Sequence, residues 1–489
     1  MTGTLTRTLG DGLPWAVLLT LAVWAPGLHG QTAQNDDPIP FQSYELENGL
    51  TVILAPDEGS TAVAVNLWYD VGSRHEPPGR SGFAHLFEHL MFEGSENVEP
   101  GEHMLLVERA GGSVNASITE DRTNYFQTLP PERVNLALWL EAERLRNLEV
   151  TEENMAREVE VVKEERRQRY DNSPYGTTQL QAFYYAAYDS TSCFPYAHSV
   201  IGSMEDLDAA ELDDVQAFFD THYVPGNATL AVVGAFDPEE VRALIQEYFS
   251  PIPPGEVPPE PECTEPFSHL PVKEEVADPN ANLPAVFVSY GAVPADHPDR
   301  HALRVLTSIL GTGETSRLHQ GLVRESQVAV DASSFALFRK DPGLLVFLAI
   351  ANQGIEPEEL LEALDREVER IVEEGVTPEE VERAGNRQRA NEILERQTVM
   401  GRAEALQRYN HFHGTPEAIR GDLEGYLAVT PEDVQEVARR YLDPENRAVL
   451  ITRPGPSAEE ADGPPGPDGS DAEPADQGSP DGGEEEDHD

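Results

Sequence analysis

The chain has 489 residues and a formal net charge of −55, from 89 acidic and 34 basic side chains. A surface this acidic argues against nucleic acid or an anionic membrane as partner, and is typical of a solvated surface suited to solubility or high salt. Hydrophobic residues make up 39% of the chain, enough for sizeable cores, and the length predicts two or three domains.

Residues 1–33 are predicted to be a signal peptide. Their apolar stretch, Leu13–Trp24, is too short to span a membrane comfortably and is ended by Pro26. Cleavage is expected after Gly30 or Ala33. We therefore expect an exported protein, periplasmic or extracellular, with no stable membrane anchor. The alternative is a retained single-helix anchor.

The stretch "GFAHLFEHLMFEGS" (82–95) contains histidines four residues apart. On a helix His85 and His89 share a face and aim at one point, as a zinc pair does. Glu88 flanks that face, where a general base for a zinc-bound water stands. The remaining helix positions are apolar, so the three polar side chains need partners if the helix is buried. A structural helix with two surface histidines is the alternative.

Zinc in a catalytic site needs a third protein ligand, and a later helix is its best source. The segment "TEENMAREVEVVKEERRQRYDNSPYG" begins at Thr151, a suitable N-cap. Glu158 and Glu165 are seven residues apart and share a face. Glu164 is the rival of Glu165, because periodicity does not separate these neighbours.

The domain prediction places a first domain at 38–250, a Pro-rich linker at 251–269 and a second domain at 270–455. Residues 456–489 are acidic and should be disordered. The two domains resemble each other in order: apolar strand, polar loop, apolar helix ending in glycine. The fold class is α+β (mixed α/β), with two homologous domains that each contain a mixed sheet covered by helices.

Some local elements are predicted more closely. The stretches "TVILAP" (51–56) and "TAVAVNLWYDV" (61–71) are expected to form a hairpin. Thr377 and Thr430 each begin a helix with a capping box followed by proline. Cys193 and Cys263 show no metal-binding spacing. They could pair in an oxidising compartment, but two unpaired thiols fit the sequence equally well.

The motif around His85 looks like the zinc site of the pitrilysin/insulinase family of metallopeptidases. It resembles above all the subgroup with mitochondrial processing peptidase and the bacterial paired-subunit peptidases. Further stretches resemble the family's edge-strand segment, its third-ligand helix and later landmarks: "GGSVNASITEDRTNYF", "REVEVVKEERRQRYDNSPYG", "FPYAHSVIGSMEDL" and "HYVPGNATLAVVGAFDPEEV". The resemblance covers about residues 41–453.

The resemblance implies one Zn²⁺ per chain. His85 and His89 match the histidine ligands, and Glu165 matches the glutamate ligand ahead of Glu164. Glu88 matches the general base. Glu158 matches an acid behind the ligands that orients the site, a role consistent with its place on the helix face.

The resemblance also implies how substrate and partner bind. Asn115 and Ala116 match positions that hold the substrate backbone along a sheet edge. In the second domain, Arg324 matches an arginine that holds substrate, but Asp331 stands where the family has a tyrosine. An ionised aspartate is no replacement for that phenol donor. We therefore expect a dimer, with an inactive homologous subunit favoured over a second copy.

The expected function is that of a zinc metalloendopeptidase that hydrolyses peptides or unfolded segments. The alternative is a non-catalytic assembly or partner subunit of a metallopeptidase-like complex, against which the intact motif speaks. A zinc hydrolase acting on a non-peptide bond is a third class.

Overall fold

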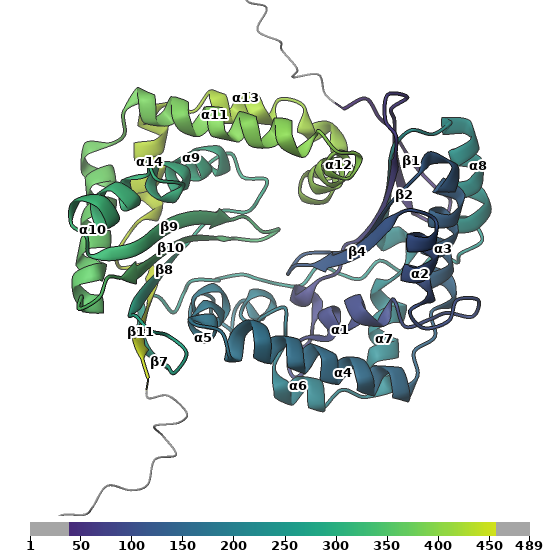
Figure 1. The fold of residues 1–489 in the computed structure, drawn as a ribbon, viewed down its shortest axis with the longest axis horizontal. Coiled ribbons are helices and arrows are strands. Elements are labelled where there is room, and N and C mark those ends of the chain that lie inside the picture. Colours follow the sequence, from purple (N-terminus) through teal and green to yellow (C-terminus); the bar gives the residue numbers. More distant parts are fainter. Residues whose placement is uncertain (1–38, 456–489) are drawn as a thin grey trace, which may run out of the picture. The chain divides into compact units, whose positions relative to one another are not determined.

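The computed structural model describes residues 39–455, so the expected leader and acidic tail lie outside the described residues. Two mixed sheets organise this part of the chain (Figure 1). The six-stranded sheet has the order β1-β2-β6-β3-β5-β4, and the five-stranded sheet has the order β7-β11-β8-β10-β9.

The first half of the described chain builds the six-stranded sheet. Its strands are β1 (Gln42–Glu45), β2 (Thr51–Pro56), β3 (Val63–Tyr69), β4 (Ser113–Ile118), β5 (Thr123–Leu129) and β6 (Ala228–Gly234). Its helices are α1 (Phe83–Leu90), α2 (Glu102–Arg109), α3 (Val134–Asn147), α4 (Glu152–Arg166), α5 (Gly176–Leu180), α6 (Met204–Asp208), α7 (Leu212–His222) and α8 (Pro238–Phe249). The π-helical turns η3 (Arg167–Asp171) and η4 (Gln181–Tyr185) extend α4 and α5.

The second half builds the five-stranded sheet. Its strands are β7 (Val272–Asp278), β8 (Ala285–Gly291), β9 (Ala329–Leu337), β10 (Leu344–Ala351) and β11 (Arg447–Pro454). Its helices are α9 (Arg300–Gly311), α10 (Pro357–Glu374), α11 (Pro378–Glu395), α12 (Val399–His413), α13 (Asp422–Leu427) and α14 (Pro431–Tyr441), and the π-helical turn is η7 (His319–Glu325). Capping boxes at Thr377 and Thr430 begin α11 and α14, as predicted.

The two sheets repeat one strand order. Strands β2, β6, β3, β5 and β4 of the first correspond in order to β7, β11, β8, β10 and β9 of the second. Each sheet has one parallel pair, β2 with β6 and β7 with β11, while its other pairs are antiparallel. This repetition confirms the predicted mixed α/β fold with two related sheets, while the exact domain boundaries stay a prediction.

The predicted hairpin between β2 and β3 is wrong. Strand β6 lies between them, parallel to β2 and antiparallel to β3. The hairpin partner of β2 is the short strand β1 instead. Both β2 and β6 are buried along nearly their whole length, as strands in the centre of a covered sheet are, and local turn signals do not identify such a distant partner.

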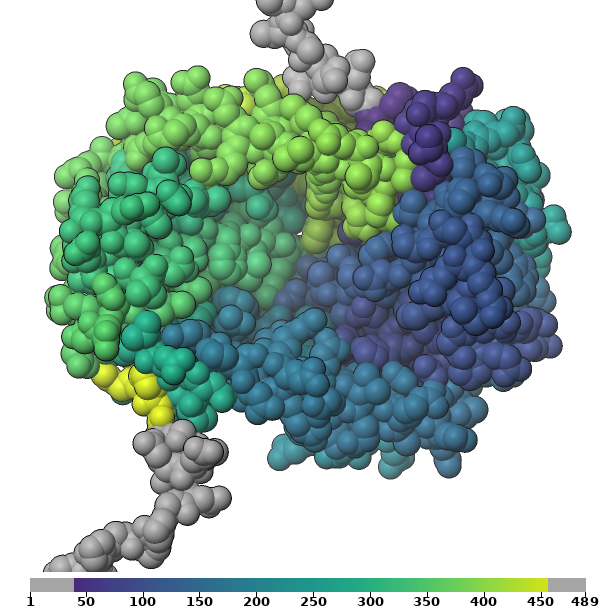
Figure 2. All heavy atoms as spheres, in the orientation of Figure 1, coloured from purple at the N-terminus to yellow at the C-terminus, as the bar shows by residue number. Residues whose placement is uncertain are grey.

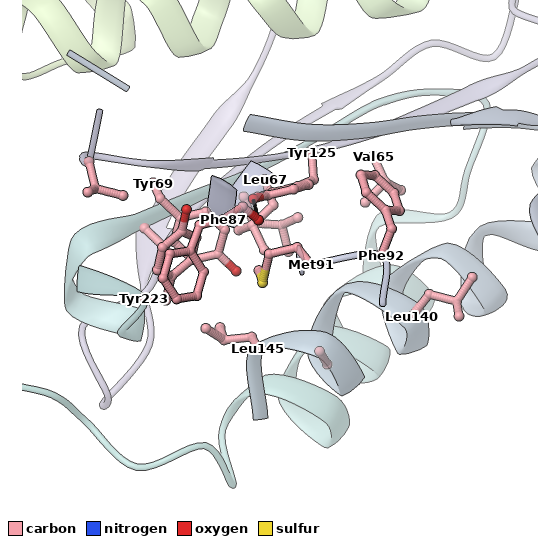
Figure 3. Packing of buried hydrophobic residues seen from close by; sticks show 14 of the residues in the cluster. Val65, Leu67, Tyr69, Phe87, Met91, Phe92, Tyr125, Leu140, Leu145 and Tyr223 are labelled. Atoms are coloured by element: carbon pink, nitrogen blue, oxygen red, sulfur yellow. Dashed lines mark hydrogen bonds between the residues drawn. The ribbon is translucent and has the colours of Figure 1, made fainter. Parts of the chain in front are cut away.

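One face of the first sheet packs on helices from the same half. Val65, Leu67 and Tyr69 of β3 contact apolar side chains of α1 and α3 (Figure 3). The Tyr125 hydroxyl on β5 donates to the Phe87 carbonyl at 3.2 Å, which ties α1 to the sheet. This packing fixes the helix that carries the histidine motif against β3 and β5.

The opposite face of the first sheet packs on α12, which comes from the second half (Figure 1). Leu406 and Ala403 are fully buried there against β2, β3 and β6. Glu404 accepts hydrogen bonds from Asn66 and Asn124, both at 2.8 Å. In the space-filling view, the light-green atoms, which include those of α12, lie against purple and blue atoms of the first half (Figure 2).

The second sheet is covered in the same way by a helix from the first half. Ala182 and Ala186, in and just after η4, pack against Phe287 and other apolar residues of β8 and β11. The Ser289 hydroxyl on β8 donates to the Ala182 carbonyl at 2.7 Å. Each half therefore completes the core of the other.

Cys193 and Cys263 form a disulfide, so the pairing that the sequence left open is present. The bond joins the loop after η4 to the Pro-rich segment 251–269, which contains no helix or strand. Within the described range, no helix has the length and apolarity needed to cross a membrane.

The exchange of helices gives a testable consequence. We expect Leu406→Ala to lower the free energy of unfolding by about 2–5 kcal/mol, because it opens a cavity under the first sheet. The control is Leu394→Ala on α11, where the leucine is 60% exposed, and a shift of less than about 0.5 kcal/mol is expected. Urea denaturation followed by tryptophan fluorescence and circular dichroism measures both. Equal effects of the two changes would contradict the interlocked packing.

Candidate metal centre

Helix α1 presents its three polar side chains to one cavity. His85 and His89 lie one turn apart, with ring centroids 5.0 Å apart, and Glu88 lies beside them. The apolar residues of α1 are buried in the core of the first half. The helix is therefore held by its apolar faces, and the polar face is left for chemistry.

The N-terminus of α1 is held by a carboxylate from the preceding loop. Glu76 is fully buried and accepts the backbone N–H groups of Gly82 at 2.9 Å and Ala84 at 2.7 Å. These are helix-start donors that no local side chain caps. His198 Nε2 lies 3.1 Å from Glu76 and supplies a partner for the buried charge. Sequence reasoning missed both residues, because a capping group six residues upstream leaves no spacing signal.

Helix α4 brings the third candidate ligand. Thr151 caps it with a hydrogen bond from the Asn154 N–H, as predicted at that position. One oxygen of Glu165, Oε2, lies 3.6 Å from Nε2 of both His85 and His89. Glu164 points away and bonds to Gln168 and Arg167. The structure thus brings Glu165, and not Glu164, to the histidines.

The donor set fits a zinc ion. One atom each from His85, His89 and Glu165 lie within 4.8 Å of one another. Ligands at zinc-bond lengths around a tetrahedral ion are roughly 3.4 Å apart, close to the 3.6 Å separations seen between Glu165 and the histidines. Glu158 lies 3.3 Å from Nδ1 of His89, on the ring nitrogen opposite the cluster. That contact orients the ring, as carboxylates beside metal-binding histidines do.

The same contacts shift the acid–base behaviour of the cluster. Burial raises the pKa of Glu88 to about 7. Burial acts to lower the pKa of His89, but hydrogen bonds to Glu158 and Glu165 raise that pKa to about 9. The bond to His89 lowers the pKa of Glu165. Negative charge therefore gathers around the histidines, and a cation bound at Nε2 would replace the proton that His89 holds.

The cluster lies in a cavity of about 470 Å³. One wall is β4, an edge strand that pairs only with β5 among the described residues. Ala116 lines the cavity, while Asn115, next to it on β4, is exposed and lies outside the lining. Further polar residues of the lining were not predicted from the sequence: Ser117, Thr119, Glu120, Arg169, Tyr170 and Tyr184.

A residue from the second half reaches this cavity wall, but it is not the expected Arg324. Arg324 is 60% exposed and pairs with Glu314, so the structure does not bring it to the cavity. Instead Arg339, which is buried, donates to Glu120 at 2.6 Å. Its guanidinium also lies over the ring of Tyr184, 5.5 Å from the centroid. The role predicted for Arg324 stays a prediction, and Asp331 lies on the exposed edge strand β9.

Two family models match this chain. Residues 51–192 match the family model described as insulinase, peptidase family M16, and residues 209–387 match the model described as the peptidase M16 inactive domain. Both matches are to domains of one class of peptidase. The chain belongs to peptidase family M16, and the resemblance inferred from its motifs is confirmed.

Individual relatives agree with this assignment. The zinc protease PqqE of Helicobacter pylori is 30% identical, with 91% of this chain and 98% of that protein covered. The mitochondrial-processing peptidase subunit beta of Bos taurus is 27% identical, with 84% and 83% covered. A crystal structure of a protease from Helicobacter pylori superposes with a TM-score of 0.79 at 28% identity, covering 85% of this chain and all of that chain.

The choice between the two neighbouring glutamates can be tested directly. We expect Glu165→Gln to weaken zinc binding by more than about a hundredfold, since replacing even a residue behind a ligand costs 10–100-fold. Glu164→Gln is the matched control, and its affinity should stay within about twofold of wild type because Glu164 faces away from the cluster. Competition with a fluorescent chelator measures both. Loss of zinc from Glu164→Gln alone would contradict the assignment of Glu165 as the ligand.

The buried carboxylate at the start of α1 gives a second prediction. Glu76→Gln keeps the shape of the side chain but replaces one of its two acceptor oxygens by an NH₂ group. Each oxygen of Glu76 now accepts one backbone N–H, so one of these hydrogen bonds is lost. We expect a loss of stability of about 1–3 kcal/mol, together with weaker zinc binding as α1 shifts. The measurements are thermal unfolding and zinc titration. Unchanged zinc affinity in a destabilised variant would show that Glu76 supports the fold alone.

Proposed function

We propose that this chain is a zinc-dependent endopeptidase with one zinc ion held by His85, His89 and Glu165. The observation that carries the proposal is the convergence of these three donors beside Glu88, in a cavity walled by an edge strand. Zinc bound there would polarise the attacking water and the scissile carbonyl.

Glu88 is the proposed general base. Its carboxylate takes a proton from the attacking water and later gives it to the nitrogen of the leaving amine. Burial raises the pKa of the Glu88 carboxyl, which strengthens it as a base for this transfer. Glu158 holds the His89 ring through Nδ1, so that Nε2 stays directed into the cluster.

The substrate is proposed to be an extended peptide that adds to the free edge of β4. Backbone groups of Ser113–Ile118 pair with β5 on one side only, so the other side can receive a strand. Ala116 would lie beneath the peptide, with Asn115 next to it on the same strand. Because this mode reads mainly backbone, we propose broad side-chain specificity.

The location and the partner follow as parts of the same proposal. The disulfide between Cys193 and Cys263 supports an oxidising compartment, in agreement with the predicted leader, and we propose export to the periplasm or the cell exterior. A relative named as a subunit, the mitochondrial-processing peptidase subunit beta, supports a dimeric assembly. We propose an inactive homologous subunit as partner, because Asp331 stands where the family has a tyrosine that helps to hold substrate.

The deciding experiment compares wild type with Glu88→Gln on a quenched fluorescent peptide library, with zinc measured by mass spectrometry of the folded protein. We expect about one zinc per chain in both. Cleavage should fall by a factor of about 10²–10⁴ in the variant, because only the proton transfer is lost. Chelation should stop wild-type cleavage, and added zinc should restore it.

The other outcomes are equally informative. Zinc without cleavage in either protein would favour the non-catalytic subunit, and addition of candidate partner chains would then test whether the site is completed in trans. Absence of zinc from wild type would refute the metal centre itself.

A further inference from the structure

The second half contains a cavity that is the structural counterpart of the metal centre. In the first half the cavity lies between α1, β4 and α4. In the second half a cavity of about 110 Å³ lies between α9, β9 and α11, the corresponding elements of the repeat. The repeated fold has therefore kept a hollow at the same place.

The side chains at the ligand positions have changed. On α1 the spacing is His85, Glu88, His89, and on α9 Arg304, Thr307 and Ser308 have the same spacing and line the second cavity. Asn391 corresponds to Glu165, since each stands fourteen residues after the threonine that caps its helix. It also lines the second cavity.

The replacement set suits an anion instead of a cation. No aspartate, glutamate or histidine lines this cavity. Arg387 donates to the Ser308 hydroxyl at 3.2 Å, and the Arg304 guanidinium lies over the Phe338 ring at 5.0 Å. Neither arginine forms an ion pair with a carboxylate in the part of the chain that the structure describes. Two such guanidinium groups, with an amide at Asn391, match the oxygens of a carboxylate.

A neighbouring cavity of about 280 Å³ shares Arg304 and Asn391 and does contain carboxylates. Each of these is already bonded to an arginine. The bonded pairs are Asp422 with Arg300, Glu395 with Arg408, and Glu392 with Arg396. The positive charge of Arg304 is therefore not neutralised from that side.

Side chains connect the second cavity with the metal centre. Phe335 of β9 lines the second cavity, and its ring meets that of Phe183 with centroids 6.0 Å apart. The next residue, Tyr184, lines the cavity of the metal centre. Arg339, one residue after Phe338, bonds to Glu120 in that same wall. The linings of the two cavities are thus connected through packed side chains.

We infer that the cavity of Arg304, Ser308, Arg387 and Asn391 binds a carboxylate group of the peptide substrate. The inference rests on the proposed peptidase function for the identity of the ligand. A peptide offers this group at its C-terminus and on its aspartate and glutamate side chains. The second half then acts as an anchor that holds one charged group while the first half holds the scissile bond.

The test measures binding without cleavage, in the full chain carrying Glu88→Gln. The probes are three fluorescein-labelled ten-residue peptides: one with a free C-terminal carboxylate and no acidic residue, its C-terminal amide, and the amide with one internal glutamate. Fluorescence anisotropy at constant salt should show about tenfold or tighter binding of at least one carboxylate peptide over the plain amide. Which peptide gains affinity separates a terminal from a side-chain carboxylate.

Substitutions of residues that line the cavity form the second part of the test. Arg304→Gln and Arg387→Gln should each reduce the carboxylate preference to less than about threefold. Asn391→Asp, nearly the same shape, should abolish it by repulsion. Arg389→Gln on α11 is the matched control, because Arg389 is exposed and lines neither cavity. This variant should keep the carboxylate preference.

The failures of the two proposals are distinguishable. A carboxylate preference in the binding assay, with no cleavage by wild type either alone or with candidate partner chains, would support the anchor and refute the peptidase. Cleavage by wild type without a carboxylate preference would support the peptidase and refute the anchor. Equal losses in Arg389→Gln and Arg304→Gln, or no binding of any peptide, would overturn the anchor.

Discussion

Each sheet of this protein buries its second face against a helix supplied by the other half, and the rest of the structure depends on that exchange. Asn66 and Asn124 are fully buried on the first sheet, and Glu404 of α12 accepts a hydrogen bond from each. Without α12 these amides would lose a charged partner and apolar strands would face water, a cost of several kcal/mol. The halves are therefore interdependent, although each has its own sheet.

The metal centre benefits from this arrangement because its parts come from elements that cannot move independently. Helix α1 is packed on β3 and β5, and its start is fixed by the buried carboxylate of Glu76. The β4–β5 loop at the cavity wall is tied to the second half through Glu120 and Arg339. Donors held in this way are already close to the separations that an ion requires, so little reorganisation is needed on binding.

The sequence predicted most of what is local and little of what is distant. The helix spacing of His85, Glu88 and His89 indicated a shared face, and the capping threonines marked three helix starts correctly. The pairing of β2 with β6 was missed, because it joins residues about 180 positions apart and no turn signal records it. Arg339 was missed for the same physical reason, since it acts across the fold on Glu120. Glu76 was missed although its partners are only six and eight residues away, because a loop carboxylate that binds backbone N–H groups leaves no periodic signal.

The repeated fold explains why a half without metal ligands would still keep a cavity at their place. The hollow arises where a helix, an edge strand and a second helix meet, and this meeting follows from the strand order that both sheets share. In the second half it is lined by Arg304, Ser308 and Asn391 at positions that correspond to histidines and a glutamate in the first. In a chain with a net charge of −55, guanidinium groups that have no carboxylate partner among the described residues forgo the stabilisation of an ion pair, up to about 1 kcal/mol each. The presence of these two guanidinium groups at the lining of a cavity that corresponds to the metal centre is most simply explained by a ligand that supplies the missing negative charge.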